Sequence, residues 1–318
     1  MTDRRSWLRM ALGAGTALGL GPRLAIASGP EPLATRAIPS SGERIPVVGL
    51  GSSATFRSVA DSADVAALRK VLAMLVSRGA TVFDTAPSYG ASEAVAGRLA
   101  RELGITRQVF WATKVNVAAR GGGAADPAAA RAQVEESFRR AGVEIMDLIQ
   151  VHNLGDVPVQ LGILKELKAA KRLRYLGVTT TSKAQYAALA RIMRAEPLDF
   201  IGVDYAVDNR GVEDEVLPLA AERGIAVMVY LPFGRTRLFR RVGERKLPAW
   251  AAGFDAASWA QFFLKFVLGH PAVTVVTPAT SQPRHLADNL EAGTGRLPDA
   301  AMRRRMAEFV DALPAAGG

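Results

Sequence analysis

The stretch VFDTAPSYG, residues 82–90, decides which fold this chain is expected to adopt. A short apolar run there ends in Asp84, a charge that a buried strand does not need, and Tyr89 follows in the next loop. Two later apolar runs end in the same manner, one at Lys114 and one at His152. In a barrel of parallel strands the strand ends gather on one face, where active sites lie. We therefore expect these four side chains to meet at one end of such a barrel.

Eight apolar runs of this kind alternate with segments of helical pattern from Arg36 onward. Continuous apolar runs are typical of strands buried on both faces, and intervening helices favour a parallel sheet. The pattern predicts an α/β fold, a (β/α)8 TIM barrel with an N-terminal hairpin turning at 40–43 and an extra C-terminal helix. The expected strands are Val47–Leu50, Thr81–Asp84, Val109–Lys114, Met146–Val151, Leu173–Thr179, Phe200–Asp204, Ala226–Tyr230 and Val273–Thr277.

The segments between the runs carry helix signals. Residues 259–267 place large apolar side chains at i, i+3, i+4, i+7 and i+8, the spacing of one buried helical face. Asp126 followed by Pro127 predicts a capped helix start for the segment that runs to Ala141. Glycines that would end a helix in the left-handed conformation are Gly79, Gly142 and Gly224.

A doubly wound open sheet is the structural alternative to a barrel. Such a sheet usually carries a glycine-rich phosphate-binding turn after its first strand. Here Gly49 and Gly51 supply only Gly-x-Gly, and the third glycine of that turn is missing. The barrel is therefore favoured.

The composition is that of a globular protein of 318 residues, with 49% apolar and 22% charged residues. The absence of cysteine excludes disulfides and thiolate chemistry, and three scattered histidines argue against a metal centre, so we expect no metal. A net charge of +10 suits an anionic partner, such as a phosphorylated cofactor, nucleic acid or a membrane surface. No RNA-binding aromatic motif or zinc finger accompanies the charge, so we expect no nucleic-acid partner.

Residues 1–27 have the pattern of an export signal. Arg4 and Arg5 form a twin-arginine pair, an apolar stretch follows, and Ala25-Ile26-Ala27 offers a small-x-small cleavage site. The apolar stretch is shorter than the roughly 20 residues that a membrane span needs. A basic N-terminal tail without a signal is the alternative. We expect the twin-arginine translocation machinery to export the chain, leaving 28–318 as a periplasmic or secreted barrel domain.

The four strand-end side chains together suit proton donation to a carbonyl oxygen. Tyrosine is a weak acid, with an ordinary pKa of about 10. The ammonium of Lys114 would lower the pKa of Tyr89, Asp84 would hold that ammonium, and His152 would orient the carbonyl. Singly, each residue also fits a structural role, such as a cap, a solvated strand end or a loop aromatic. A reduced nicotinamide would supply the electrons.

Several segments resemble the aldo-keto reductases. They are FDTAPSYGASE at 83–93, ATK at 112–114, DLIQVHN at 147–153, RYLGV at 174–178, YLPFG at 230–234, PATS at 278–281 and HLADNL at 285–290. The resemblance spans roughly 36–300 in the correct order. It implies a TIM barrel that binds NADPH or NADH across its mouth and reduces small aldehydes or ketones. It also implies Tyr89 as the general acid, with Asp84 and Lys114 tuning it and His152 orienting the carbonyl. We expect the chain to be a monomer. Twin-arginine leaders occur in one bacterial branch of the family, which this N-terminus resembles.

The same resemblance implies a set of cofactor-binding residues: Thr179, Thr180, Tyr230, Pro232, Thr280, Arg284, Asp288 and Asn289. Tyr230 matches the residue that stacks on the nicotinamide. Four positions depart from the family pattern. Thr180 stands for an asparagine and Gly202 for a glutamine, so the nicotinamide loses side-chain hydrogen bonds. Ala279 and His285 stand where some members grip the 2′-phosphate of NADPH, which leaves the choice between NADPH and NADH open.

Two basic segments remain. Residues 235–254 are expected to form a long loop that closes over the cofactor pyrophosphate as a basic lid, with a solvated basic face as the alternative. Arg303, Arg304 and Arg305 are expected to form a solvated face of the C-terminal helix.

Two rival functions stay open. A nucleotide-binding barrel without turnover, acting as a redox sensor or scaffold, is favoured by Thr180, Gly202 and the scarcity of reduced nucleotide outside the cytoplasm. A non-redox barrel enzyme such as an isomerase is the other rival. The loops that select a substrate carry no motif that identifies it.

Overall fold

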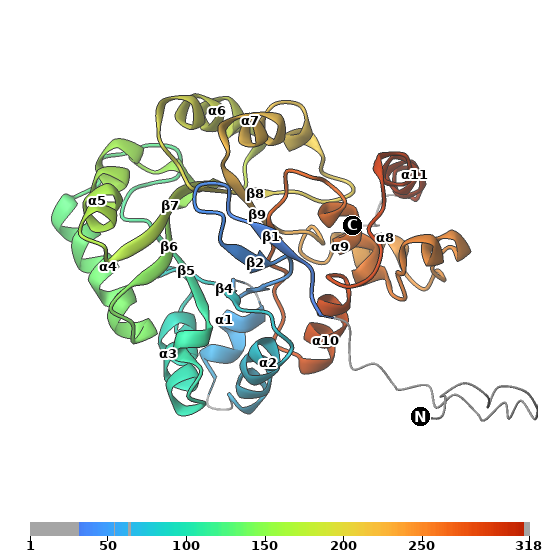
Figure 1. The fold of residues 1–318 in the computed structure, drawn as a ribbon, viewed down its shortest axis with the longest axis horizontal. Coiled ribbons are helices and arrows are strands. Elements are labelled where there is room, and N and C mark those ends of the chain that lie inside the picture. Colours follow the sequence, from blue (N-terminus) through green and yellow to red (C-terminus); the bar gives the residue numbers. More distant parts are fainter. Residues whose placement is uncertain (1–31, 54, 63–64, 315–318) are drawn as a thin grey trace, which may run out of the picture. The chain divides into compact units, whose positions relative to one another are not determined.

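The computed structural model describes residues 32–53, 55–62 and 65–314, and a barrel of eight parallel strands forms its centre (Figure 1). The strands follow one another around the barrel in chain order, from β3 to β10. Parallel bridges from Val48 to Val276 and from Gly51 to Ala279 join the two ends of this order, so the barrel is nearly closed. The strands are β1 (Thr35–Ala37), β2 (Arg44–Pro46), β3 (Leu50–Gly51), β4 (Val82–Asp84), β5 (Phe110–Val115), β6 (Met146–Val151), β7 (Leu173–Thr180), β8 (Phe200–Asp204), β9 (Ala226–Tyr230) and β10 (Val275–Val276). Each predicted strand overlaps one barrel strand, which confirms the TIM barrel.

Helices lie around the outside of the barrel (Figure 1). They are α1 (Thr55–Ala60), α2 (Ala66–Ser77), α3 (Ser92–Glu102), α4 (Pro127–Ala141), α5 (Val157–Ala169), α6 (Tyr186–Ala195), α7 (Val216–Arg223), α8 (Arg237–Val242), α9 (Trp259–Leu268), α10 (Pro283–Glu291) and α11 (Ala300–Asp311). Short 3-10 turns are η1 (Thr106–Gln108), η2 (His152–Leu154), η3 (Lys183–Gln185), η4 (Gly211–Glu213) and η5 (Ala249–Phe254). The extra C-terminal helix predicted from the sequence is α11.

The predicted start and end of α4 are confirmed. The Asp126 side chain accepts a hydrogen bond from the backbone N–H of Ala128, and Pro127 fills the first turn, where no donor is needed. Gly142 ends the helix at φ 74°, a left-handed conformation that costs glycine little. Gly224 ends α7 in the same way, at φ 63°.

The hairpin of β1 and β2 closes the end of the barrel where the strands begin. Its strands pair antiparallel across the turn predicted at 40–43. Ile38 and Ile45 are buried in one cluster with Phe110 and Phe200, the first residues of β5 and β8. Figure 1 shows the hairpin in blue across the centre of the barrel. The opposite end, where the strands stop, is therefore left for the functional residues.

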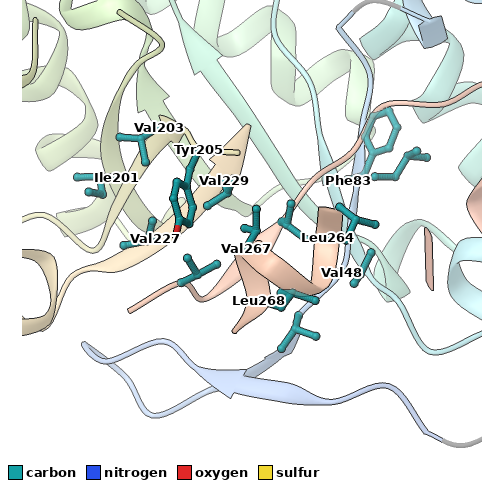
Figure 2. Close-up of a cluster of buried hydrophobic side chains, with 14 of the residues drawn as sticks. Val48, Phe83, Ile201, Val203, Tyr205, Val227, Val229, Leu264, Val267 and Leu268 are labelled. Atoms are coloured by element: carbon teal, nitrogen blue, oxygen red, sulfur yellow. The ribbon is translucent and has the colours of Figure 1, made fainter. Parts of the chain in front are cut away.

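Helix α9 is buried on every side rather than on one face. Figure 2 shows its Leu264, Val267 and Leu268 beside Val227 and Val229 of β9, and all five side chains are fully buried. Burial of one such side chain contributes about 1.5–3 kcal/mol relative to exposure. The predicted stripe at 259–267 is present, but the residues between its members are buried as well.

The predicted long loop at 235–254 is wrong, because the segment contains α8 and η5. Leu238 and Val242 stand four residues apart and are both buried, which gives α8 an apolar face. On another side of α8, Arg237 donates two hydrogen bonds of 2.8 Å to the carboxylate of Asp208. The charge of the segment masked this short helical pattern in the sequence.

The predicted solvated face of α11 is wrong at Arg303. Its guanidinium bonds to Glu213 at 2.6 Å, to the carbonyl of Phe266 at 3.0 Å and to the hydroxyl of Tyr205. The Arg303 side chain is only 11% exposed, whereas Arg304 is exposed as predicted. The partners lie 37 to 98 residues away in the chain, so local sequence could not indicate them.

The predicted export signal at residues 1–27 lies outside the described residues. Among the helices that the structure describes, none is long and apolar enough to cross a membrane.

Candidate active site

Lys114 and Asp84 form a buried ion pair at the ends of adjacent strands β5 and β4. The ammonium of Lys114 donates to Asp84 Oδ1 at 2.7 Å and to the carbonyl oxygen of Thr85 at 2.8 Å. The two charged side chains are 1% and 4% exposed. Asp84 is in register with Ala112, so Lys114, two residues further along β5, emerges on the same face as Ala112. The pairing of two strands therefore builds the ion pair.

Burial and charge act on this ion pair in opposite directions. Burial raises the pKa of Asp84 in spite of the neighbouring charge of Lys114. Burial lowers the pKa of Lys114, but Asp84 and Tyr89 more than offset this, and its pKa is raised. The ammonium therefore stays protonated at neutral pH.

Tyr89 lies in the loop after β4 and faces the ammonium. Its backbone N–H donates to the carbonyl of Ala86 at 3.0 Å, a tight turn that keeps the side chain near the strand end. The Lys114 nitrogen lies 5.2 Å from the centroid of the Tyr89 ring. The imidazole of His152 meets that ring edge-on, with the centroids 6.0 Å apart. The four residues predicted to meet are therefore neighbours.

The net shift of the Tyr89 pKa is opposite to the predicted one. Burial raises the pKa, the charge of Lys114 lowers it and that of Asp84 raises it, so that it ends above 10.0. A buried phenolate loses its hydration, and an ammonium shared with a carboxylate does not make up for that loss. Lys114 therefore offsets part of the cost of burial and does not make the phenol a strong acid.

His152 follows β6 and opens η2. Burial lowers its pKa to about 3, and the charges of Lys114 and Arg120 contribute to the shift. At neutral pH the imidazole is therefore neutral and has one N–H to donate. Its Nδ1 atom is buried and has no hydrogen-bond partner in the described part of the chain. Such a ring can donate to a carbonyl oxygen without adding charge to the site.

Tyr230, at the end of β9, reaches across the barrel to the same carboxylate. Its hydroxyl donates to Asp84 Oδ1 at 3.2 Å and accepts a hydrogen bond from Gln150 at 2.8 Å. Its ring lies directly on Gly202, where an added Cβ would stand 2.4 Å from the ring carbon Cε2. The space that Gly202 leaves free is therefore occupied by the tyrosine.

A pocket of about 290 Å³ opens over these residues. All four predicted catalytic residues line it, and so do three of the predicted cofactor residues, Thr179, Tyr230 and Pro232. The other lining residues are Gly51, Ser53, Thr55, Arg120, Asn153, Thr181, Leu231, Phe233, Arg235, Thr236, Thr277 and Ala279. Strand ends from both sides of the barrel thus share one cavity.

Thr180, also predicted to bind the cofactor, does not line this pocket. It is fully buried, and its hydroxyl bonds to Gln185 at 2.5 Å and accepts from the backbone N–H of Ser182 at 3.1 Å. The hydroxyl thus stabilises the turn after β7.

The remaining predicted cofactor residues gather around α10, outside the pocket lining. Thr280 accepts from the backbone N–H of Gln282 at 3.0 Å, just before the helix. The carboxylate of Asp288 accepts hydrogen bonds from α9 and its cap, one of them from Gln261 at 2.7 Å. Arg284 is exposed and Asn289 is buried. Their role in binding an adenosine group stays a prediction.

Two residues of the site were given no role by the sequence motifs. Gln150 does not line the pocket, but its amide donates to the hydroxyl of Tyr230 at 2.8 Å. It is a polar residue inside an apolar run, two positions before His152, and the alternation of side chains along a strand could have indicated it. Arg120 lies outside every motif, and its one signal is its place in the loop after a strand.

The fold and the site together define a (β/α)8 barrel whose mouth holds a tyrosine, a lysine, an aspartate and a histidine. The sequence profile of the Aldo/keto reductase family matches residues 47–307, and the chain belongs to this family.

Known relatives agree with this assignment. A probable aldo-keto reductase 1 from Glycine max is 30% identical over 174 residues, which is 52% of this chain and 49% of the relative. The chain thus spans about half the length of this curated relative. A Bacillus halodurans aldo-keto reductase in its holo form superposes with a TM-score of 0.69 at 21% identity, covering 87% of this chain and 96% of the other. A Klebsiella pneumoniae aldo/keto reductase in complex with NADP and acetate gives a TM-score of 0.66 at 25% identity, covering 85% and 93%.

Proposed function

We propose that this chain reduces aldehydes or ketones to alcohols with NADPH or NADH, and that Tyr89 is the proton donor. The observation that carries the proposal is the ammonium of Lys114, which Asp84 holds 5.2 Å from the Tyr89 ring centroid at the wall of a pocket. Membership of the aldo/keto reductase family and the NADP complex of the Klebsiella pneumoniae relative support it.

The pocket lining fits a nicotinamide nucleotide. Tyr230 lines the pocket with an aromatic ring, whose hydroxyl is fixed by hydrogen bonds to Asp84 and Gln150. A flat heterocycle stacks well on such a ring. Arg235 lines the same pocket, and a guanidinium suits a phosphate.

The residues of the site have distinct roles in this reaction. A bound reduced nicotinamide supplies hydride to the carbonyl carbon. His152, neutral at physiological pH, donates its N–H to the carbonyl oxygen and holds it beside Tyr89. Because its pKa is raised, Tyr89 is protonated when substrate binds, and it passes that proton to the same oxygen. The ammonium of Lys114 stabilises the phenolate that is left.

Replacement of Tyr89 by phenylalanine tests the proton donor. Since a positioned acid contributes about a hundredfold to ten-thousandfold, we expect Tyr89→Phe to lower kcat by that factor while nucleotide affinity is unchanged. Oxidation of the reduced nucleotide with a panel of small carbonyls measures kcat, and fluorescence titration measures affinity. Tyr175→Phe, at the opposite end of the barrel, is the matched control and should retain activity. A Tyr89→Phe variant as fast as wild type would show that another group donates the proton. Nucleotide binding without turnover in the wild type would favour the sensor or scaffold.

We also propose that residues 1–27 export the folded chain through the twin-arginine pathway to the periplasm or beyond. The Arg4-Arg5 pair, the apolar stretch and the small-x-small site motivate this. Cell fractionation tests it: Arg4→Lys with Arg5→Lys should keep the chain in the cytoplasm, and Arg9→Lys should not. Export of the double variant at the wild-type level would contradict the proposal.

A further inference from the structure

The walls of the pocket carry more positive than negative charge. Among the described residues that line it, the cations are Lys114, Arg120 and Arg235, and the one carboxylate is that of Asp84. Asp84 is already bonded to Lys114 at 2.7 Å. Neither arginine has a carboxylate within ion-pair distance in the described ranges of the chain. Two guanidinium charges at the pocket are therefore left for a ligand.

The lack of a partner is specific to these positions. Arg237, two residues after Arg235, binds Asp208 through two hydrogen bonds of 2.8 Å. A carboxylate is thus available near this loop, but it is engaged by the arginine that lies outside the pocket lining. The arginine in the lining remains available to an anion.

The two pocket arginines come from opposite sides of the barrel. Arg120 follows β5 and Arg235 follows β9, which stand four places apart in the ring of eight strands. Arg235 shares its side with Tyr230 and the other residues predicted to bind the cofactor, which lie in or after β7 to β10. Arg120 lies between Tyr89, after β4, and His152, after β6. The charge of Arg235 also acts on Tyr89, whose pKa it lowers, whereas that of Arg120 acts on His152.

The loop of Arg120 is fastened to the loop of His152. The backbone N–H of Gly121 donates to the carbonyl oxygen of Asn153, the residue after His152, at 2.8 Å. At Gly155 the two loops approach so closely that an added Cβ would stand 2.8 Å from the carbonyl oxygen of Ala119. After burial and Lys114, the charge of Arg120 is a further cause of the lowered pKa of His152. The guanidinium and the imidazole therefore act on the same part of the pocket.

We propose that the substrate is an aldehyde or ketone that also carries a carboxylate, and that this carboxylate pairs with Arg120 while the carbonyl oxygen lies between Tyr89 and His152. The inference rests on the proposed function and names its substrate class. A guanidinium binds a carboxylate through two parallel hydrogen bonds, which fixes orientation as well as charge. The separation between the carboxylate and the carbonyl then selects the length of the substrate.

Paired acids and esters test this assignment. Glyoxylate, succinic semialdehyde and 4-carboxybenzaldehyde span a range of lengths, and the methyl ester of each removes the charge but keeps the carbonyl. We expect the wild type to prefer at least one acid over its ester. In Arg120→Gln, kcat/KM for that acid should fall about tenfold, mainly through a higher KM, while kcat/KM for the ester is unaffected. A tenfold loss is at the lower end of what a hydrogen bond to a charged group contributes, because Arg120 is exposed.

Arg191→Gln is the matched control, since Arg191 is an exposed arginine on α6 outside the pocket lining. It changes net charge equally and should leave the acid-to-ester ratio at the wild-type value. The proposal is overturned if the wild type reduces every ester as well as its acid. It is also overturned if Arg120→Gln lowers kcat/KM for acid and ester alike.

Binding of succinate, measured by calorimetry on the full chain with NADP present, separates this inference from the proposed function. Succinate affinity should fall about tenfold in Arg120→Gln and remain unchanged in Arg191→Gln. If no carbonyl is reduced but succinate binding depends on Arg120, the anion site is supported and the reductase function is wrong. If carbonyls are reduced but succinate binds equally to both variants, the reductase function stands and the anion site is overturned.

Discussion

The two sides of the barrel mouth are held together by different kinds of interaction. On the side of β4 to β6, the site depends on charge: Lys114 is bonded to Asp84 at 2.7 Å, and a neutral His152 stands beside them. On the side of β7 to β10, it depends on shape: the Tyr230 ring fills the space above Gly202. The first side matches the family resemblance residue by residue, and the second keeps Tyr230 but departs from the family pattern at Thr180, Gly202, Ala279 and His285.

The two sides of the mouth differ in how well they tolerate a substitution. A buried charge that loses its partner is costly, so neither residue of the ion pair can change alone. A ring held by packing and hydrogen bonds can exchange space with a neighbouring position at smaller cost. At Gly202 the missing side chain leaves space that the Tyr230 ring occupies.

Loss of the ammonium should have the largest effect. Lys114→Met leaves the Asp84 carboxylate buried without its cation, and we expect the free energy of unfolding to fall by about 3–5 kcal/mol. Urea unfolding followed by circular dichroism measures it. The double variant Asp84→Asn with Lys114→Met removes both charges and should recover most of the stability without recovering turnover. Equal losses in the single and the double variant would mean that the charge of Asp84 is not what destabilises the single one.

A methyl group at Gly202 should have the next largest effect. Because the added Cβ would stand 2.4 Å from the Tyr230 ring, Gly202→Ala should displace the ring, cost about 1–3 kcal/mol and weaken nucleotide binding. Gly162→Ala is the control, since no described atom beyond its chain neighbours and the backbone of α5 lies within 4 Å of its added Cβ. That change should be neutral or stabilise the protein by about 0.5–1 kcal/mol. If Gly202→Ala and Gly162→Ala change the free energy of unfolding equally, the position of the Tyr230 ring does not depend on Gly202.

The neutral imidazole should make stability depend on pH. The pKa of His152 is about 3 in the folded chain, below its ordinary 6.5, so between these values the unfolded chain binds a proton that the folded chain does not. The stability contribution is therefore complete above pH 6.5 and falls by about 1.4 kcal/mol per pH unit on acidification toward 3. Unfolding measured across this range should show a shallower slope in His152→Gln than in wild type or in the exposed control His285→Gln. Identical slopes in all three would contradict a neutral, buried His152.

Removal of the Tyr230 hydroxyl should have the smallest effect. Tyr230→Phe keeps the ring but loses the bond to Asp84 and leaves the Gln150 amide without its acceptor, at a cost of about 1 kcal/mol. A double-mutant cycle with Gln150→Leu measures the coupling between the two side chains. Additive losses would show that their hydrogen bond contributes nothing to stability.

The barrel and the order of its strands could be predicted from the amino-acid sequence, because apolar runs and helical periodicity are local properties. It also indicated Asp84, Tyr89, Lys114 and His152, since polar residues at the ends of successive parallel strands have one face on which to meet. The resemblance to the aldo-keto reductases then identified the family, which the match over residues 47–307 confirms.

The pKa values and the distant contacts of those residues could not be predicted, because they depend on the folded chain. Burial outweighs the charge of Lys114 and raises the pKa of Tyr89, an outcome that depends on how much water the assembled site excludes. The glycine at 202 is explained by its contact with the Tyr230 ring, and the burial of Arg303 by its ion pair with Glu213. Both contacts join segments that are remote in sequence. A local sequence pattern can indicate which side chains belong to a site. The solvation of those side chains and their distant partners are set only when the chain folds.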